Sequence, residues 1–296
     1  MVSYDLAIKA CEHQSCIDIK TSSNNLLINK YLPFMGKHSP KNAHRLFCFP
    51  FAGGSASNFQ LLRKNSPDYI DVQPLQLPGR ENRFSEKPHD TIDEILDDLR
   101  KVLTPFIHEP YSLLGYSLGA HVAHAFIGDL QKRQLPLPQK LIVAARRAPS
   151  APARHTGLHK LPSALFWQQL AQYEGTSSEV LNNPELRALL EPMLRADFAL
   201  SDHPCSLPGP IPTSIVALAG SDDPFASPTE MAGWTKETQG NFNLVVVEGS
   251  HFFIRTNADS FVHHVCRQFA DAGPYQDKSA ATSGGSRPEF QEHPAI

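Results

Sequence analysis

The chain has 296 residues, of which 41% are apolar, and this is enough to bury one large hydrophobic core. Its 27 basic and 30 acidic side chains leave a formal net charge of −3. A nearly balanced charge excludes the strong positive field that binding to nucleic acid or to an anionic membrane requires. We therefore expect small or locally complementary partners, with no nucleic acid and no membrane among them.

The cysteine content and the hydropathy of the sequence indicate the cellular compartment of the protein. The five cysteines, at positions 11, 16, 48, 205 and 266, form no CxxC pair, and an odd number does not resemble a disulfide framework. The opening sequence MVSYDLAIKACEHQSC lacks the continuous apolar run of an export signal. No stretch approaches the roughly 18 apolar residues that span a bilayer. These features predict a cytoplasmic protein that is neither exported nor membrane-spanning.

The two ends of the chain differ from its middle. Residues 1–42 are polar and weakly patterned, and residues 272–296 are rich in Gly, Pro and Ser. Segments of this composition bury little apolar surface. We therefore expect a flexible N-terminal extension and a disordered C-terminal tail around one folded domain at residues 43–271.

Within that domain, apolar runs alternate with helical patterns. Near-continuous apolar runs predict buried strands at 44–51, 69–77, 111–115, 140–145, 213–220 and 242–249. Residues 91–107 have apolar side chains at helical spacing behind a capping-box pair, Thr91 and Glu94, and helices are also expected at 117–133 and 258–270. The repeated order of strand and helix predicts the α/β class, with a mostly parallel, doubly wound sheet.

One stretch, from about residue 150 to 207, interrupts this alternation. It has no strand pattern, whereas 161–175 and 183–200 show helical periodicity. We expect an inserted helical subdomain that acts as a lid. Its apolar side chains have two open interpretations, as ordinary buried helix faces or as the lining of a substrate channel. These side chains belong to Phe166, Trp167, Leu170, Leu189, Leu190, Met193 and Leu194.

The string GYSLG at 115–119 follows a predicted strand and opens a predicted helix. This context of strand, sharp turn and helix is what a nucleophile elbow requires. Its glycines let neighbouring backbone approach a strained turn that exposes the serine hydroxyl. Ser117 is therefore the candidate nucleophile, and the alternative is an ordinary helix N-cap serine.

A serine hydroxyl needs an adjacent base, and in this kind of hydrolase an acid and then a histidine follow the nucleophile along the chain. His251 lies two residues beyond the last predicted strand and is the candidate base. Asp222 and Asp223 both follow the strand before it. The spacing from Gly220 favours Asp223 as the acid that orients the base, and leaves Asp222 as a turn former.

The tetrahedral intermediate of acyl transfer also needs backbone N–H donors for its oxyanion. We expect one from Leu118, directly after the nucleophile, and one from Ala52 in the turn PFAGGSASNF. A phosphate-binding loop is the alternative for this turn, but no GxxxxGK[ST] follows. Two histidine pairs lack a carboxylate or cysteine that would complete a ligand set, so we expect no metal site. The pairs are His121 with His124 and His263 with His264.

Several blocks together resemble the type II thioesterases that accompany polyketide and nonribosomal peptide synthetases. They extend over residues 44–270 and read FCFPFAGGSASNF, LQLPGRENRFSEKP, LLGYSLGAHVA, ARRAP, ELRALLEPMLRADFAL, LAGSDDP and EGSHFF. The glycine turn, LPGRE, RRAP and LRADF are more specific than the elbow. The elbow departs from the family's usual His before the serine and Met after it, because this chain has Tyr116 and Leu118.

The resemblance implies an α/β-hydrolase fold with a mobile helical lid, and the same triad and oxyanion donors at the matching positions. It also implies hydrolysis of acyl groups from the phosphopantetheine thiol of acyl carrier or peptidyl carrier domains, which clears stalled or misprimed synthetase modules. No metal and no dissociable cofactor are expected. The expected partners are a carrier domain and an acyl thioester, and the expected state is a monomer.

Other functions remain open. A product-releasing thioesterase, or a hydrolase of small esters or lipids, would use the same triad, because fold and triad do not fix the leaving group. A catalytically idle subunit that binds a carrier protein or an acyl group is the alternative of a different class.

Three arginines are candidates for carrier binding. Arg146 and Arg147 directly follow one predicted strand and Arg80 follows another, so all three are expected at the same edge of the sheet as the nucleophile. There they would bind the phosphate of the pantetheine arm or the acidic helices of a carrier. The alternative for Arg146 and Arg147 is an internal ion pair that holds the lid or Asp197.

Overall fold

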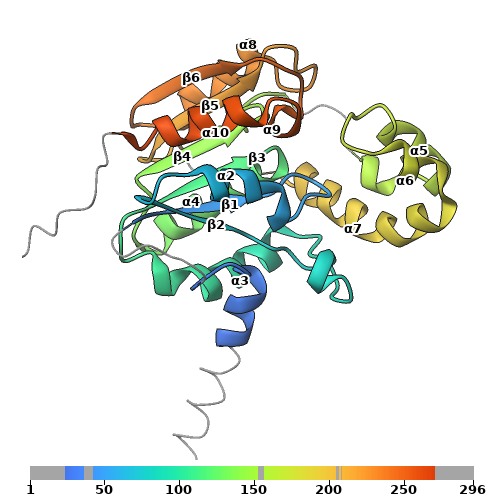
Figure 1. Cartoon of the computed structure of the whole chain (residues 1–296), viewed down its shortest axis with the longest axis horizontal. Coiled ribbons are helices and arrows are strands. Elements are labelled where there is room, and N and C mark those ends of the chain that lie inside the picture. Colours follow the sequence, from blue (N-terminus) through green and yellow to red (C-terminus); the bar gives the residue numbers. More distant parts are fainter. Residues whose placement is uncertain (1–23, 37–42, 153–156, 205–206, 208, 271–296) are drawn as a thin grey trace, which may run out of the picture.

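A six-stranded sheet forms the centre of the protein. The computed structural model describes residues 24–36, 43–152, 157–204, 207 and 209–270, so the predicted C-terminal tail lies outside the described residues. The strand order is β2-β1-β3-β4-β5-β6, and every neighbouring pair is parallel. The predicted strands and the doubly wound α/β class are confirmed (Figure 1). The strands are β1 (His44–Phe49), β2 (Ile70–Pro74), β3 (Tyr111–Tyr116), β4 (Lys140–Ala144), β5 (Ser214–Gly220) and β6 (Phe242–Val247).

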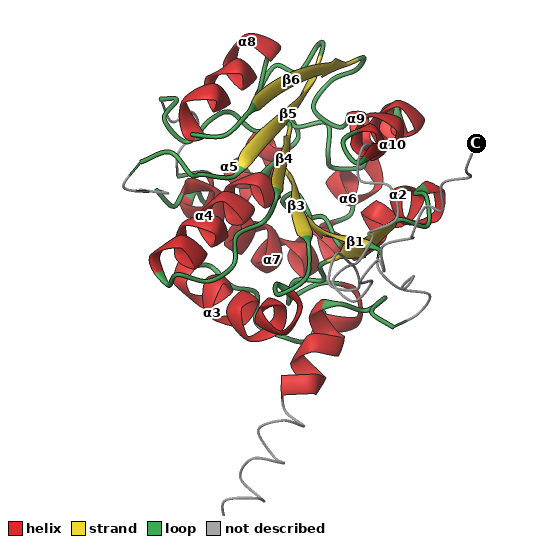
Figure 2. Cartoon of the chain, turned by 90° about the vertical axis from the view of Figure 1, so that its left-hand side faces the viewer, coloured by secondary structure: helices red, strands yellow, loops and turns green. Residues whose placement is uncertain are grey.

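Helices cover both faces of this sheet (Figure 2). Strand residues point alternately to the two faces, so Leu113 joins one apolar cluster and Leu114 the other. Burial on both faces explains why the strands read as near-continuous apolar runs. The helices and 3-10 turns outside the insertion are η1 (Ala56–Phe59), α2 (Gln60–Asn65), η2 (Glu81–Arg83), α3 (Ile92–Leu103), η3 (Thr104–Phe106), α4 (Leu118–Lys132), α8 (Pro228–Met231), η5 (Ala232–Glu237), α9 (Phe253–Thr256) and α10 (Ala258–Arg267).

The parallel register brings the carboxyl ends of the strands to one edge. Phe49, Gly115 and Val143 are aligned across three neighbouring strands, and Gly220 pairs with Val247 on the other side of the sheet. The loops that follow β1, β3, β4, β5 and β6 therefore open on the same side. Every predicted triad and oxyanion residue lies in one of these loops or at the first turn of α4.

Helix α3 ends before the limit predicted for it. Pro105 lacks the N–H that would continue the helix, and the chain turns into η3 there. The hydroxyl of Thr91 accepts the Glu94 N–H at 3.4 Å, as expected of an N-cap. The Glu94 carboxylate accepts instead from the N–H of Asp90, also at 3.4 Å. The reciprocal half of the predicted capping box is therefore displaced by one residue.

Between β4 and β5 the chain leaves the sheet and forms the predicted helical insertion, which lies to one side of the sheet in Figure 1. Pro184 opens α7, and the Asn183 side chain caps it by accepting the N–H groups of Glu185 and Leu186 at 2.9 and 3.2 Å. No strand lies between β4 and β5 in the described residues. The insertion contains η4 (Leu158–Lys160), α5 (Ser163–Leu170), α6 (Ser178–Asn182) and α7 (Pro184–Asp202).

The N-terminal extension predicted at residues 1–42 is too long. Residues 24–31 are helical, and the side chain of Tyr31 is fully buried against the domain. Its hydroxyl donates to Asp98 of α3 at 3.0 Å, and the Arg83 guanidinium lies 4.2 Å from the centre of its ring. The folded domain therefore includes this helix. The helix is short, and the polar sequence before it gives no start signal that separates it from the rest of the extension.

Three histidines are buried against the sheet: His44 in β1, and His121 and His124 in α4. Burial lowers the pKa of His44 to about 4, of His121 to about 3 and of His124 to about 4, because a charged ring loses its hydration there. Lys140 beside His44 and Arg146 beside His121 act in the same direction. All three rings are therefore neutral in the folded protein near neutral pH.

We expect the free energy of unfolding to fall as the pH is lowered from 6.5 towards 4, because the unfolded chain then binds protons that the folded chain excludes. Each ring adds a slope of at most about 1.4 kcal/mol per pH unit. Urea unfolding across this range measures the slope. His44→Gln should reduce it, with His263→Gln at an exposed position as the matched control. A free energy that stays constant across the range would contradict the expectation.

Candidate active site

Ser117 stands at the sharp turn between β3 and α4. Its backbone has φ 49° and ψ −111°, a strained conformation for a residue other than glycine. The turn leaves no space for neighbouring side chains: a Cβ on Gly115 would lie 2.3 Å from the Cα of Ala120, and one on Gly119 would lie 2.1 Å from the Phe49 carbonyl oxygen. Packing therefore requires both glycines of GYSLG, and the turn presents Ser117 at the carboxyl edge of the sheet.

His251 and Asp223 lie in line with Ser117. The Nε2 atom of His251 is 3.2 Å from Ser117 Oγ, and its Nδ1 atom is 2.8 Å from Asp223 Oδ2. Because an ionised carboxylate only accepts hydrogen bonds, Nδ1 carries the ring proton and Nε2 is left to accept the serine proton. The His251 and Asp223 side chains are 9% and 0% exposed. The structure thus brings together three residues from three separate loops in the geometry of a Ser-His-Asp triad.

The two neighbouring aspartates differ in what they contact. Asp223 Oδ1 accepts the N–H groups of Phe225 and Ala226 at 2.8 and 3.1 Å, which fixes the carboxylate while Oδ2 faces the histidine. Asp222 is exposed, and its carboxylate accepts the Ser221 hydroxyl at 2.7 Å. This geometry supports Asp223 as the orienting acid and places Asp222 in the turn.

Tyr116, the residue before the nucleophile, holds the loop that carries the base. Its buried hydroxyl donates to the carbonyl oxygen of His251 at 2.7 Å and accepts the N–H of Ile254 at 3.3 Å. Burial raises the pKa of Tyr116 well above its usual value, so the hydroxyl keeps its proton and remains a donor. Tyr116, one of the two residues by which this elbow departs from the type II pattern, therefore joins the elbow directly to the histidine loop.

Two backbone amides at the cavity that contains Ser117 are candidate donors to an oxyanion. Leu118 is the first residue of α4, so its N–H has no acceptor within the helix. In the turn after β1, the Gly54 N–H donates to the Phe51 carbonyl oxygen at 2.8 Å, which leaves the Ala52 N–H outside that bond. Ala52 and Leu118 both line the cavity that contains Ser117. The arrangement supports the two predicted donors.

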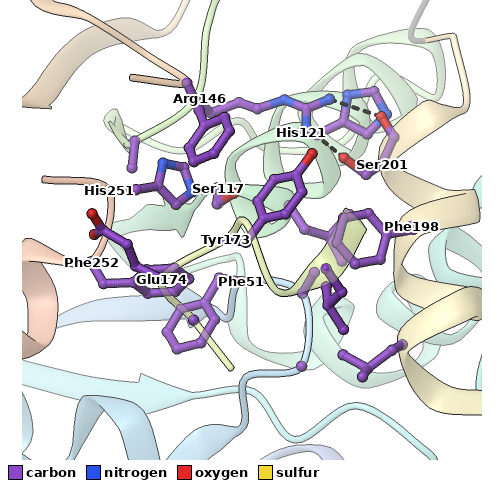
Figure 3. Close-up of a pocket in the computed structure, with 18 of the residues that line it drawn as sticks. Phe51, Ser117, His121, Arg146, Tyr173, Glu174, Phe198, Ser201, His251 and Phe252 are labelled. Atoms are coloured by element: carbon purple, nitrogen blue, oxygen red, sulfur yellow. Dashed lines mark hydrogen bonds between the residues drawn. The ribbon is translucent and has the colours of Figure 1, made fainter. Parts of the chain in front are cut away.

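The insertion and the sheet loops enclose a cavity of about 1050 Å³. Figure 3 shows Ser117, His251 and Tyr173 around the same space, with Phe198 of α7 further along it. The two interpretations of the insertion's apolar residues overlap, because Leu170, Met193 and Leu194 belong to the buried cluster of the insertion and also line the cavity. Phe166 and Trp167 are buried in the same cluster but do not line the cavity, and Leu189 is 51% exposed. The cavity is lined by Leu170, Leu190, Met193 and Leu194.

The segment after α5 contacts the loops of the triad. The ring of Tyr173 stacks on Phe225, with centroids 4.6 Å apart and an angle of 9° between the planes. Glu174 accepts the hydroxyl of Ser250, the residue before the candidate base. These contacts could not be predicted from local sequence patterns, because each joins segments that are distant along the chain. They close the insertion over one side of the triad.

Comparison with known proteins identifies the family. The model of the thioesterase domain family matches residues 44–271. This chain belongs to the thioesterase family. The thioesterase is 32% identical to the gramicidin S biosynthesis protein GrsT of Aneurinibacillus migulanus over 231 residues, which are 76% of this chain and 88% of that protein. It is 33% identical to the thioesterase PikA5 of Streptomyces venezuelae over 236 residues, which are 79% of this chain and 82% of that protein.

Solved structures agree with this assignment. The thioesterase is similar to the type II thioesterase BorB from the borrelidin biosynthetic cluster, with a TM-score of 0.69 and 32% identity over 78% of this chain and 95% of that one. For the RedJ thioesterase of the prodiginine pathway in Streptomyces coelicolor, the TM-score is 0.70 at 29% identity, over 76% of this chain and 90% of that one. The α/β-hydrolase fold and the resemblance to type II thioesterases are confirmed, and the protein is a hydrolase that acts on thioesters.

Arg80 is not available to a carrier. Its side chain is only 5% exposed, and its two terminal nitrogens lie 2.9 and 2.8 Å from the two carboxylate oxygens of Asp197 in α7. The prediction that Arg80 binds a carrier is therefore wrong. The internal ion pair considered for Asp197 exists, but its partner is Arg80 and not one of the two arginines after β4. The LRADF and LPGRE blocks contained both residues, and no local spacing connects them.

The other two arginines line the cavity. The guanidinium of Arg146 donates to the hydroxyl and the carbonyl oxygen of Ser201 in α7, at 2.6 and 2.9 Å (Figure 3). The guanidinium of Arg147 lies 3.7 Å from the Glu230 carboxylate. Both side chains thus have internal contacts and also face the space that substrate would enter. Among the described residues, no group of three or more His, Cys, Asp or Glu side chains is placed to hold a metal ion.

We expect Asp223→Asn to lower kcat for a small acyl thioester by on the order of 10³-fold or more. An asparagine still reaches the imidazole but cannot stabilise the positive charge that His251 acquires. Asp222→Asn should leave kcat nearly unchanged, since that carboxylate is exposed and accepts a hydrogen bond from Ser221 in the turn. Steady-state kinetics, with circular dichroism as the check on folding, compares the two variants. A larger loss of kcat in Asp222→Asn than in Asp223→Asn would show that Asp222 is the orienting acid.

Proposed function

We propose that this protein is a stand-alone, type II thioesterase that hydrolyses acyl groups from the phosphopantetheine thiol of acyl carrier or peptidyl carrier domains. In this role it would clear stalled or misprimed modules of a polyketide or nonribosomal peptide synthetase. The observation that carries the proposal is the placement of the triad serine in the wall of a cavity of about 1050 Å³, roofed by an inserted helical segment. Such a cavity admits acyl chains of different shapes together with a pantetheine arm.

The first half of the proposed reaction forms an acyl-enzyme. Ser117 Oγ attacks the thioester carbonyl carbon while its proton moves to His251 Nε2, and the charge on the former carbonyl oxygen is held by the N–H groups of Ala52 and Leu118. Asp223 stabilises the imidazolium that results. The carbon–sulfur bond then breaks, and the proton on Nε2 passes to the departing pantetheine sulfur. The carrier leaves with a free thiol.

The second half releases the acyl group. A water molecule gives a proton to His251 Nε2 as its oxygen attacks the ester carbonyl carbon of the acyl-enzyme. The bond between that carbon and Ser117 Oγ breaks, and the serine regains its proton from the imidazolium. The products are a free carboxylic acid and the unmodified enzyme. The reaction needs only side chains and amides of this chain, and water.

The setting of the proposed reaction follows from the partners. Carrier domains belong to cytoplasmic synthetases, and we place the thioesterase in the cytoplasm as a monomer that meets them by diffusion. The thiols of Cys48 and Cys266 are both free, as a reducing compartment maintains them. In the part of the chain that the structure describes, no helix is both long enough and apolar enough to cross a membrane.

We expect an acyl-carrier thioester to be hydrolysed with a much higher kcat/KM than an oxygen ester of the same acyl group. The thiolate is the better leaving group, and the carrier adds contacts that a small ester lacks. Release of the carrier thiol and of free acid, measured by mass spectrometry, provides both rates, with Ser117→Ala as the inactive control.

The result also separates the alternative functions. Equal preference for the oxygen ester would indicate a small-ester or lipid hydrolase. A cyclised product in place of the free acid would indicate product release. The absence of turnover on every substrate would leave an idle binding subunit.

We also expect Arg147→Gln to raise the apparent KM for the acyl-carrier thioester, because the phosphate of the arm loses a cationic partner at the cavity. The effect should shrink at high salt, and a small acyl thioester without phosphate should be hydrolysed as before. Lys132→Gln is the matched control, since it lies at the far end of α4, about 22 Å of helix from the nucleophile. An equal loss on both substrates would show that Arg147 builds the site instead of docking the carrier.

A further inference from the structure

Helix α7 of the insertion carries a carboxylate that faces neither solvent nor the triad. Asp197 is fully buried, and Arg80 meets it with two parallel hydrogen bonds of 2.8 and 2.9 Å. Removing an ion pair from water is costly unless its remaining donors and acceptors are also satisfied. The remaining contacts of this pair therefore show what it holds in place.

Those contacts go to the turn after β1. The N–H of Gly53 donates to Asp197 Oδ2 at 2.7 Å, and a terminal nitrogen of Arg80 donates to the Gly54 carbonyl oxygen at 2.9 Å. The Arg80 Nε donates to the Pro78 carbonyl oxygen at 3.2 Å, so the guanidinium is itself fixed. One buried ion pair thus holds the peptide units on either side of the two glycines.

Helix α7 also lies directly against this turn. Gly53 has φ +74°, and a Cβ at this position would lie 2.9 Å from a methyl carbon of Leu194, one turn before Asp197 in the same helix. The position of the turn is therefore set by the inserted helix as well as by β1. The N–H of Gly53 belongs to the same peptide unit as the carbonyl of Ala52, so fixing it restricts how Ala52 is oriented.

We propose that Asp197, held by Arg80, is a positioning residue for oxyanion stabilisation. By fixing the peptide unit between Ala52 and Gly53, it keeps the Ala52 N–H directed into the cavity beside Ser117. The inference rests on the proposed acyl-enzyme mechanism, in which that N–H binds the oxyanion. It makes α7 part of the catalytic centre, so that any opening of the insertion occurs in α5 and α6 while α7 stays in place.

The ion pair of Arg80 and Asp197 is expected to stabilise the transition state more than it strengthens substrate binding. The charge on the carbonyl oxygen develops only as the tetrahedral intermediate forms, so a misdirected donor lowers kcat and leaves KM little changed. A transition-state analogue such as an alkyl boronic acid should lose affinity in parallel with kcat. A helix-anchoring role alone would instead change the amount of folded enzyme.

The experiment replaces the ion pair with apolar side chains of similar volume, in the double variant Arg80→Met with Asp197→Leu. Such replacements often preserve stability, but this one removes the acceptor for the Gly53 N–H. Active sites are counted with a fluorophosphonate, and turnover of an N-acetylcysteamine acyl thioester is measured per active site. We expect kcat to fall about 10²-fold, with KM nearly unchanged and weaker boronic acid binding.

The matched control is Glu191→Leu with Arg195→Met, which removes another ion pair of α7, with a separation of 2.6 Å, that does not contact the turn after β1. This variant should keep wild-type kcat per active site. Wild-type kcat in the Arg80 and Asp197 double variant would overturn the proposal, as would an equal loss in both double variants.

A second pair of variants decides the question if the first double variant does not fold. Asp197→Glu keeps the charge but moves the acceptor by one methylene, so kcat should fall further than in Arg80→Lys, which keeps the acceptor but loses the two-point contact that holds it. Equal kcat in these two variants would overturn the proposal. The small thioester needs no carrier, so a wild-type enzyme that hydrolyses it but not acyl-carrier thioesters would contradict only the proposed function.

Discussion

The buried ion pair between Arg80 and Asp197 fixes the relative positions of segments that are distant along the chain. It joins the turn after β1, the segment after β2 and the long helix of the insertion. Removing one partner would leave a buried charge without compensation, which costs about 3–5 kcal/mol. The three segments therefore depend on one another. The glycine turn, LPGRE and LRADF, which lie far apart in the sequence, contain the residues that meet at this ion pair.

The sheet edge and the insertion supply different parts of the site. The parallel sheet fixes the ends of β3, β5 and β6, and the loops there supply nucleophile, acid and base without help from the insertion. The insertion adds the walls of the cavity and contacts the triad loops through Tyr173 and Glu174. The triad thus depends on the ends of the strands, whereas the shape of the acyl pocket depends on the helices of the insertion, of which α7 is held by the pair of Arg80 and Asp197.

The sequence was sufficient for features with local signals. Strands buried on both faces read as apolar runs, and Ser117, Asp223 and His251 each directly follow such a run, so their chain order and spacing pointed to the site. The features that the sequence did not predict depend on contacts between residues that lie far apart along the chain. Arg80 and Asp197 are 117 positions apart, and nothing near either residue reveals its partner. The helix at residues 24–31 was missed for a related reason, since it is stable only through the core against which it packs.

Tyr116 has a consequence for how such sites diverge. Its hydroxyl bridges the elbow to the backbone at His251 and Ile254, so the identity of the residue before the nucleophile is coupled to the conformation of the histidine loop. A lineage that exchanges tyrosine for histidine at this position loses that bridge and must find another donor for the His251 carbonyl oxygen. The elbow and the histidine loop are thus expected to change together during evolution, and a chimera that transplants one without the other would inherit a base with a misplaced backbone.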